Sequence, residues 1–340
     1  MQSQSLFLVE ESSQVGTARR AAVDLARRQQ FDEELTGKAG LAATECATNI
    51  LKHAGTGRIM VRPIQCDDIG GVEIIALDKG PGIADVAASL RDGHSTSGTM
   101  GGGLGALSRL SERFEIFTQP GKGTAIRLEF WAQPLPNHPF PIEFGGVCVP
   151  KEGELVSGDD WSVHVWRDQI AVLVADGLGH GDMAHEAARA ATLVFAARPQ
   201  EEPQGILEAA HGALARTRGA AVAVAKLSAA GERGSFAGVG NIVARVEGGP
   251  NPGRHLVSYN GIVGHTVRKL QEFAFPWPKE ALLVLHSDGL TTHWDFSTYP
   301  GLISRHPALI AAVLYRDYDR GRDDVSVVVI RNRGSVAEAS

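Results

Sequence analysis

Aspartates recur at the ends of apolar runs in the second half of the chain, each beside a glycine or a second aspartate. They are Asp159 in SGD, Asp176 in DGLGHG, Asp288 in SDG, and Asp323 with Asp324 in RDD. Carboxylates at the ends of neighbouring strands can converge at one edge of a sandwich, and a site made of oxygen ligands favours Mg²⁺ or Mn²⁺ over zinc. A single Asp–Gly pair is an ordinary turn signal, whereas the whole set in this order predicts a metal site.

The first half carries residue types suited to binding a nucleotide. Glu45 and Asn49 lie four residues apart on an expected helix, and therefore on one face of it. An amide oxygen suits Mg²⁺, and a carboxylate beside it can take the proton of an attacking hydroxyl. Asp78 opens the sequence DKGPGI after an expected strand, where an aspartate can accept a hydrogen bond from an exocyclic amine. On their own, Glu45 and Asn49 could equally be polar residues on the solvent-exposed face of a helix.

Further glycine-rich stretches strengthen the nucleotide hypothesis. Residues 95–98 (STSG) lead into GGGLG at residues 101–105, directly before an apolar, periodic helix. The backbone N–H groups of such a loop, together with the N-terminus of the following helix, can surround phosphates. GKGT at residues 121–124 comes after that helix. A flexible linker is the alternative reading of the glycines, but all these elements in this order predict a nucleotide pocket.

Two domains are expected to position these residues. Residues 133–141 read QPLPNHPFP, and the prolines there remove backbone donors and favour extended geometry. Because single hydrophobic cores stop growing near roughly 300 residues, a chain of 340 residues is expected to divide. We place the domains at residues 1–132 and 144–332, with a linker at 133–143 and a tail at 333–340.

Apolar periodicity predicts an α+β chain. In the first domain, Ser12 or Ser13 is expected to cap a helix that reaches about residue 26, and further helices are expected at about 33–53 and 104–113. The strands of that domain are expected at residues 58–63, 72–77, 114–118 and 124–131. The second domain is expected to hold helices at 184–197 and 206–217 and strands at 162–166, 170–175, 220–227, 242–246, 281–286 and 325–330.

Composition argues against several classes of function. Apolar residues make up 43% and charged residues 21% of the chain, as in ordinary globular proteins. No apolar run approaches the roughly 20 residues that cross a bilayer, and the N-terminus lacks a signal-peptide pattern, so we expect a cytoplasmic protein without a membrane partner. A net charge of −6 with scattered Lys and Arg argues against binding nucleic acid. Cys46, Cys66 and Cys148 lack CxxC spacing, so neither a disulfide framework nor a zinc site is expected.

Residues 5–131 resemble the GHKL ATPases, and most of all the RsbT-type anti-sigma serine kinases, through DKGPGIAD and DGHSTSGTMGGGLG. The resemblance implies a GHKL-type α/β sandwich, a mixed sheet with helices on one face, that binds ATP with Mg²⁺. It implies Glu45 as general base, Asn49 as Mg²⁺ ligand and Asp78 as the adenine contact. The nucleotide loops would be formed by Gly80, Gly82, Gly101, Gly103, Gly105 and Thr124. Sensor histidine kinases share these motifs but need a dimerising helix pair, which we do not find before residue 5, so the expected phosphoacceptor is a serine of a partner protein.

Residues 145–332 resemble the PP2C phosphatases of the SpoIIE and RsbX type through VADGLGHGDMAHEAA, HSDGL and RDDVSVVVI. The resemblance implies an αββα sandwich holding two Mn²⁺ or Mg²⁺ ions. By motif match, Asp176 would bridge the ions and Gly177 would offer its carbonyl oxygen. Asp159 and Asp288 would complete the site, and Asp323 or Asp324 would close it. His180 could protonate the leaving serine oxygen or touch the phosphate, or it could only bond its own loop.

Together the resemblances imply a bifunctional regulator of a stressosome or partner-switching pathway. The expected partners are STAS-domain anti-sigma-factor antagonists or stressosome proteins of the RsbS and RsbR type, with a downstream PP2C or a sigma factor further along the pathway. Two alternatives stay open. The first domain could bind ATP as a sensor or docking module without transferring phosphate, or it could sequester a sigma factor by binding alone.

Overall fold

The computed structural model of the chain describes residues 4–90, 103–136, 141–248 and 253–334. The chain forms two compact units, and each is built from two stretches of sequence. The first unit comprises Met1–Asn137 with Phe296–Arg305, and the second comprises His138–Asp295 with His306–Ser340. The centre of the expected linker, residues 137–140, lies outside the described residues.

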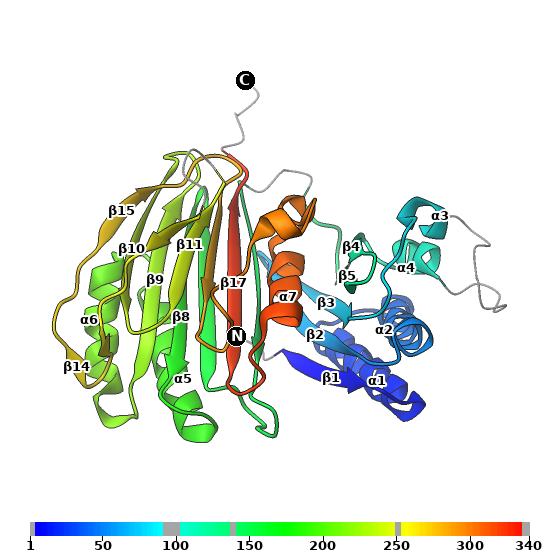
Figure 1. The fold of residues 1–340 in the computed structure, drawn as a ribbon, viewed down its shortest axis with the longest axis horizontal. Coiled ribbons are helices and arrows are strands. Elements are labelled where there is room, and N and C mark those ends of the chain that lie inside the picture. The colour runs from blue at the N-terminus through cyan, green and yellow to red at the C-terminus, as the bar shows by residue number, and fades with distance from the viewer. Residues whose placement is uncertain (1–3, 91–102, 137–140, 249–252, 335–340) are drawn as a thin grey trace. The chain divides into compact units, whose positions relative to one another are not determined.

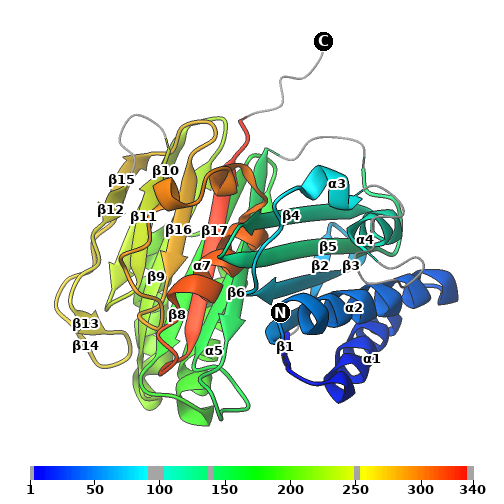
Figure 2. The same cartoon turned by 45° about the vertical axis from the view of Figure 1, so that its right-hand side comes forward.

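The first unit is a sheet with helices on one face. Its strands run antiparallel in the order β1-β2-β3-β5-β4, and α1 and α2 lie side by side on the sheet (Figures 1 and 2). The strands are β1 Ser5–Val9, β2 Gly57–Cys66, β3 Ile69–Asp78, β4 Arg113–Gln119 and β5 Gly123–Trp131. The helices are α1 Ser12–Arg28, α2 Glu33–His53, α3 Val86–Leu90 and α4 Leu104–Leu110.

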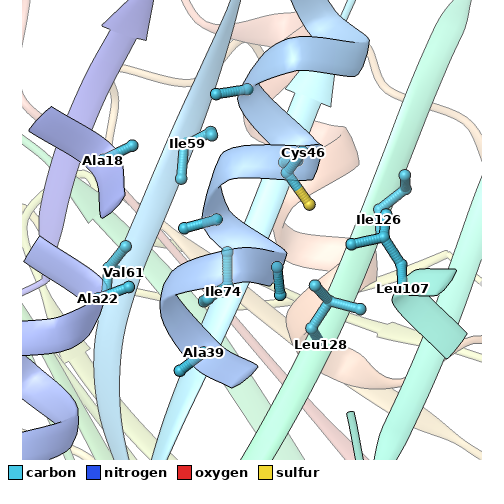
Figure 3. Packing of buried hydrophobic residues seen from close by; sticks show 14 of the residues in the cluster. Ala18, Ala22, Ala39, Cys46, Ile59, Val61, Ile74, Leu107, Ile126 and Leu128 are labelled. Atoms are coloured by element: carbon cyan, nitrogen blue, oxygen red, sulfur yellow. The ribbon is translucent and has the colours of Figure 1, made fainter. Parts of the chain in front are cut away.

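Small residues let α1 and α2 approach the sheet closely. α2 begins after Asp32, whose side chain accepts the Leu35 N–H at 2.7 Å, and buries mostly alanines and one cysteine against the strands. Figure 3 shows these side chains facing those of β2, β3 and β5. The expected serine cap of α1 is wrong: the N-cap residue is Glu11, whose N–H is accepted by the Gln14 side chain at 3.0 Å.

Glu73, on the opposite face of this sheet, is paired with two arginines. Glu73 is 1% exposed, and its carboxylate accepts hydrogen bonds from Arg62 and from Arg127 Nε, the latter at 2.6 Å. Burial by itself would raise the pKa of Glu73, but the two guanidinium groups outweigh burial and lower it. A carboxylate so deeply buried is stable only because it is paired.

Residues 296–305 belong to the first unit although in sequence they lie between two stretches of the second unit. The Thr298 carbonyl accepts hydrogen bonds from Gln119 Nε2 and Lys122 Nζ, each at 3.2 Å. The Tyr299 ring lies 6.2 Å from the Phe117 ring, centroid to centroid, and is 5% exposed. The segment therefore packs on the hairpin that joins β4 to β5.

The second unit is an αββα sandwich. One sheet has the order β15-β10-β9-β8-β7 and the other β12-β11-β16-β17-β6, while α5 and α6 cover the first sheet and α7 covers the second (Figure 1). The main strands are β6 Ile142–Val149, β7 Asp159–Trp166, β8 Gln169–Gly177, β9 Ala220–Ser228, β10 Arg233–Val239, β11 Val243–Glu247, β16 Leu282–His286 and β17 Val325–Asn332. The shorter strands are β12 Arg254–Leu256, β13 Gly261–Ile262, β14 Thr266–Val267 and β15 Phe273–Pro276, and the helices are α5 Asp182–Ala197, α6 Pro203–Ala213 and α7 Pro307–Tyr318. The expected α+β class is confirmed.

None of the helices within the described stretches is both long and apolar enough to span a membrane.

Candidate active sites

The predicted aspartates meet where strands of both sheets of the second unit end. Asp159 and Asp176 are register partners across the antiparallel strands β7 and β8. From the other sheet, Asp288 follows β16, and Asp323 and Asp324 immediately precede β17. We call Asp159, Asp176, Asp288, Asp323 and Asp324 the aspartate cluster.

Electrostatics show that these five carboxylates interact. Burial raises the pKa of Asp176 to about 9, and the other four members of the cluster add to this rise. Burial likewise raises the pKa of Asp159 to about 7, with a further contribution from Asp324. Like charges held together in a poorly solvated place disfavour the ionised form. The structure thus brings together the residues that the sequence separates by up to 165 positions, from 159 to 324.

The cluster has the chemistry of a divalent-cation site. All its donors are carboxylate oxygens, which suit Mg²⁺ and Mn²⁺. Asp159 and Asp324 are 2% and 3% exposed, and one buried oxygen of each accepts no hydrogen bond within the described residues. Among the described residues, no group of three or more His, Cys, Asp or Glu side chains is arranged closely enough to hold a metal ion. The residues present fit divalent ions in charge and donor type.

The surroundings distinguish the members of the cluster. Asp324 is buried and its Oδ1 accepts the Lys151 N–H at 2.9 Å, whereas Asp323 is exposed and accepts the Asp324 N–H at 3.0 Å. Asp288 Oδ2 accepts a hydrogen bond from Asn241 Nδ2 at 2.7 Å. Asn241 was missed as a site residue, although it lies in the motif FAGVGNIVARV.

Two glycines shape the end of β8 and the loop that follows it, which carries His180. At Gly177 a Cβ atom would lie 2.0 Å from the Ala184 carbonyl oxygen, so only glycine lets α5 approach here. Gly179 has φ +93°, a left-handed backbone that glycine adopts freely. His180 Nδ1 lies 2.6 Å from Glu154 Oε1. Sequence reasoning missed Glu154, which stands 26 positions before its partner.

In the first unit, α2 and the end of β3 supply the polar residues of the expected nucleotide pocket. Glu45 and Asn49 are partly exposed on α2, one turn apart. Asp78 ends β3, and its Oδ1 accepts the Gly80 N–H at 2.8 Å and the Thr124 N–H at 3.2 Å. Asp78 therefore ties the loop that follows it to the start of β5.

Two glycines allow this loop to pack closely between the end of α2 and the β4–β5 hairpin. A Cβ at Gly80 would lie 2.8 Å from the Ala54 side chain at the end of α2. Gly82 has φ +71°, and a Cβ there would lie 2.1 Å from the Gln119 carbonyl oxygen. Gly103 and Gly105 lie at the start of α4, and Gly101 lies outside the described residues.

Comparison with known proteins finds relatives of both halves of the chain. The family described as "Histidine kinase-like ATPase domain" matches residues 8–130. Serine/threonine-protein kinase RsbT of Bacillus subtilis (strain 168) is 33% identical over 131 residues, which are 38% of this chain and 98% of that protein. The chain belongs to the RsbT family of histidine kinase-like ATPases.

Beyond this RsbT-family part, the chain is similar to a phosphatase. Phosphoserine phosphatase RsbX of Bacillus subtilis (strain 168) is 24% identical over 140 residues, covering 41% of this chain and 70% of that protein. A structure described as "The bacterial stressosome: a modular system that has been adapted to control secondary messenger signaling" aligns with a TM-score of 0.52 and 26% identity, over 56% of this chain and 99% of that chain.

These similarities confirm the resemblances drawn from the motifs and the two expected fold families. The expected mixed sheet of the first half is wrong, however, because all pairings among its described strands are antiparallel. The similarities also confirm the expected enzyme class, since the matches are to a protein serine/threonine kinase and a phosphoserine phosphatase. The roles of individual site residues stay predictions.

Proposed function

We propose that the chain is a bifunctional regulator in a stressosome or partner-switching pathway. It acts as an ATP-dependent protein serine kinase and as a metal-dependent phosphoserine and phosphothreonine phosphatase on STAS-domain proteins. The observation that carries the proposal is the meeting of five aspartates from both sheets of the second unit, on the same chain as an RsbT-family ATPase unit.

In the phosphatase half, the aspartate cluster would hold two Mn²⁺ or Mg²⁺ ions, with Asp176 between them and the Gly177 carbonyl as a further donor. Such ions, when bound, lower the pKa of a water molecule and neutralise phosphoryl oxygens during in-line attack. The residues of the chain itself hold that arrangement: Asn241 orients Asp288, and the Lys151 N–H orients Asp324. His180 would give a proton to the leaving serine oxygen.

In the kinase half, Glu45 would take the proton of the acceptor serine and Asn49 would hold Mg²⁺. Asp78 would accept a hydrogen bond from the adenine amine. Thr124 and the glycines of the three loops (Gly80, Gly82, Gly101, Gly103 and Gly105) would surround the nucleotide.

The proposed partners are RsbS-like and RsbR-like STAS-domain proteins, with a downstream PP2C or a sigma factor further along. Supporting this choice, the chain is similar to RsbT, to RsbX and to a chain of a stressosome structure. Both activities on one phosphosite would consume ATP without net change, so we expect separate targets or a switch between the activities.

The direct test uses the full chain and an RsbS-like STAS protein. With Mg²⁺ and γ-labelled ATP, we expect label on a serine or threonine of the STAS protein. With Mn²⁺ and a separately phosphorylated STAS protein, we expect release of inorganic phosphate. Binding of ATP without any transfer would favour the sensor alternative, and absence of phosphate release would remove the phosphatase assignment.

Asp78→Asn should weaken ATP binding by about 10- to 100-fold, since losing a hydrogen bond to a buried group costs about 1 to 3 kcal/mol. The reason is that an amide NH₂ turned toward the adenine amine would oppose one donor with another, while the remaining oxygen could still bind Gly80 and Thr124. Calorimetric titration with ATP measures the change. Asp68→Asn, on the exposed turn between β2 and β3, is the matched control and should bind as the wild type does. Equal affinity in both variants would refute the adenine contact.

A further inference from the structure

His180 has a carboxylate partner at the rim of the aspartate cluster. Its Nδ1 lies 2.6 Å from Glu154 Oε1, a distance typical of a strong hydrogen bond. The side chains of His180 and Glu154 are 49% and 30% exposed, so the pair remains open to an incoming substrate. A Cβ at Gly181 would lie 3.1 Å from Glu154 Oε2, which shows how closely the carboxylate packs on the loop of His180.

A short chain of hydrogen bonds joins this pair to the cluster. The Glu154 N–H donates to the Lys151 carbonyl at 3.0 Å, and the Lys151 N–H donates to Asp324 Oδ1 at 2.9 Å. The turn from Lys151 to Glu154 thus holds Asp324 at one end and His180 at the other.

We propose that Glu154 is a positioning residue that holds His180 as the proton donor to the leaving oxygen of phosphoserine. The inference rests on the proposed phosphatase function. With Nδ1 bonded to the carboxylate, the ring orientation is fixed and Nε2 is the nitrogen left to face a substrate.

A water oxygen forms a new bond to phosphorus while the bond between phosphorus and serine Oγ breaks, and the bonding electron pair leaves with Oγ. The proton on His180 Nε2 passes to Oγ, which gives the serine hydroxyl. The protons of the attacking water stay on the phosphate or pass to solvent, and His180 takes up a proton from solvent.

The nature of the leaving group separates this role from a merely structural one. An alkoxide leaves poorly unless it is protonated, so a serine phosphate depends on the donor. A nitrophenolate leaves readily as the anion, so p-nitrophenyl phosphate does not. A change that only loosened the loop would slow both substrates alike.

The test compares Glu154→Gln with Glu152→Gln, an exposed neighbour of the same charge. General acid catalysis contributes about 10²- to 10⁴-fold, so we expect Glu154→Gln to lower kcat for a phosphoserine protein by about 10- to 100-fold. Its kcat for p-nitrophenyl phosphate should change by less than about threefold, and Glu152→Gln should match the wild type on both substrates. His180→Gln should show the same selectivity, and adding Glu154→Gln to it should cost little more, because Glu154 acts through His180.

Selective loss on phosphoserine supports the pair, whereas equal loss on both substrates, or none, overturns it. Additive losses in the double variant would show that Glu154 does not act through His180. If the wild type hydrolyses neither substrate, the proposed phosphatase function falls and this inference falls with it, an outcome distinct from an active wild type with an indifferent Glu154→Gln variant.

Discussion

Asp176→Asn should abolish manganese-dependent hydrolysis of a phosphoserine protein, with a loss of about 10³-fold or more. Asp176 interacts with every other member of the aspartate cluster, so we expect its carboxylate to be a ligand of the proposed ions. An amide oxygen in its place carries no charge and binds only weakly. Metal ions contribute several kcal/mol of charge stabilisation in the transition state, and about 1.4 kcal/mol corresponds to tenfold in rate. The measurement is phosphate release as a function of Mn²⁺ concentration.

The same variant should fold normally. Because the pKa of Asp176 without metal is about 9, the side chain is uncharged at neutral pH, as an amide is, so we expect the thermal unfolding temperature without metal to stay close to that of the wild type. Glu208→Gln, on the exposed side of α6, serves as the charge-matched control and should keep full activity. If Asp176→Asn released phosphate at the wild-type rate at every Mn²⁺ concentration, the aspartate cluster would not be the metal site.

Glu45→Ala should bind ATP as the wild type does but transfer phosphate to a STAS protein about 10²- to 10⁴-fold more slowly, the range expected when a general base is removed. Glu45 lies one turn before Asn49 on α2, so the proposed base stands beside the proposed Mg²⁺ ligand without being one itself. The experiment pairs calorimetric ATP titration with transfer of labelled phosphate.

Glu34→Ala is the matched control on the same helix. Glu34 forms only an exposed ion pair with Lys38, at 2.7 Å, and such pairs contribute little. Transfer at the wild-type rate by Glu45→Ala would refute the role of the base. Loss of ATP affinity in Glu45→Ala would instead point to a part in nucleotide binding.

Residues that work through local patterns could be predicted from the sequence. α2 occupies Glu33–His53, as expected, because a side-chain cap at Asp32 and a regular apolar stripe define it. The aspartates stand at strand ends, as expected, because apolar runs and Asp–Gly turns are both local signals.

Contacts between distant segments could not be predicted in the same way. Asn241 meets Asp288 across 47 positions, and only the folded sheet brings the two side chains together. The same holds for Glu154 and His180. No periodicity or spacing in the sequence marks such partners.

Some elements were missed for a different physical reason. α7 is buried along most of its length, so it shows no alternation of polar and apolar residues. β6 contains Gly145, which weakens the strand pattern, yet a Cβ there would lie 2.5 Å from the Ala308 side chain of α7. Gly145 therefore makes β6 hard to predict from the sequence, and it is also the residue that allows α7 to pack closely on β6.

The return of residues 296–305 to the first unit bears on how this protein can be divided. A fragment ending at the proline-rich stretch would carry Phe117 without Tyr299, the ring that lies against it. The complementary fragment would carry Tyr299 on a ten-residue segment, residues 296–305, without the β4–β5 hairpin on which that segment packs. Evolutionary or engineered separation of the two halves would therefore require new surface chemistry at both places, whereas the intact gene keeps the two halves inherited, expressed and degraded together.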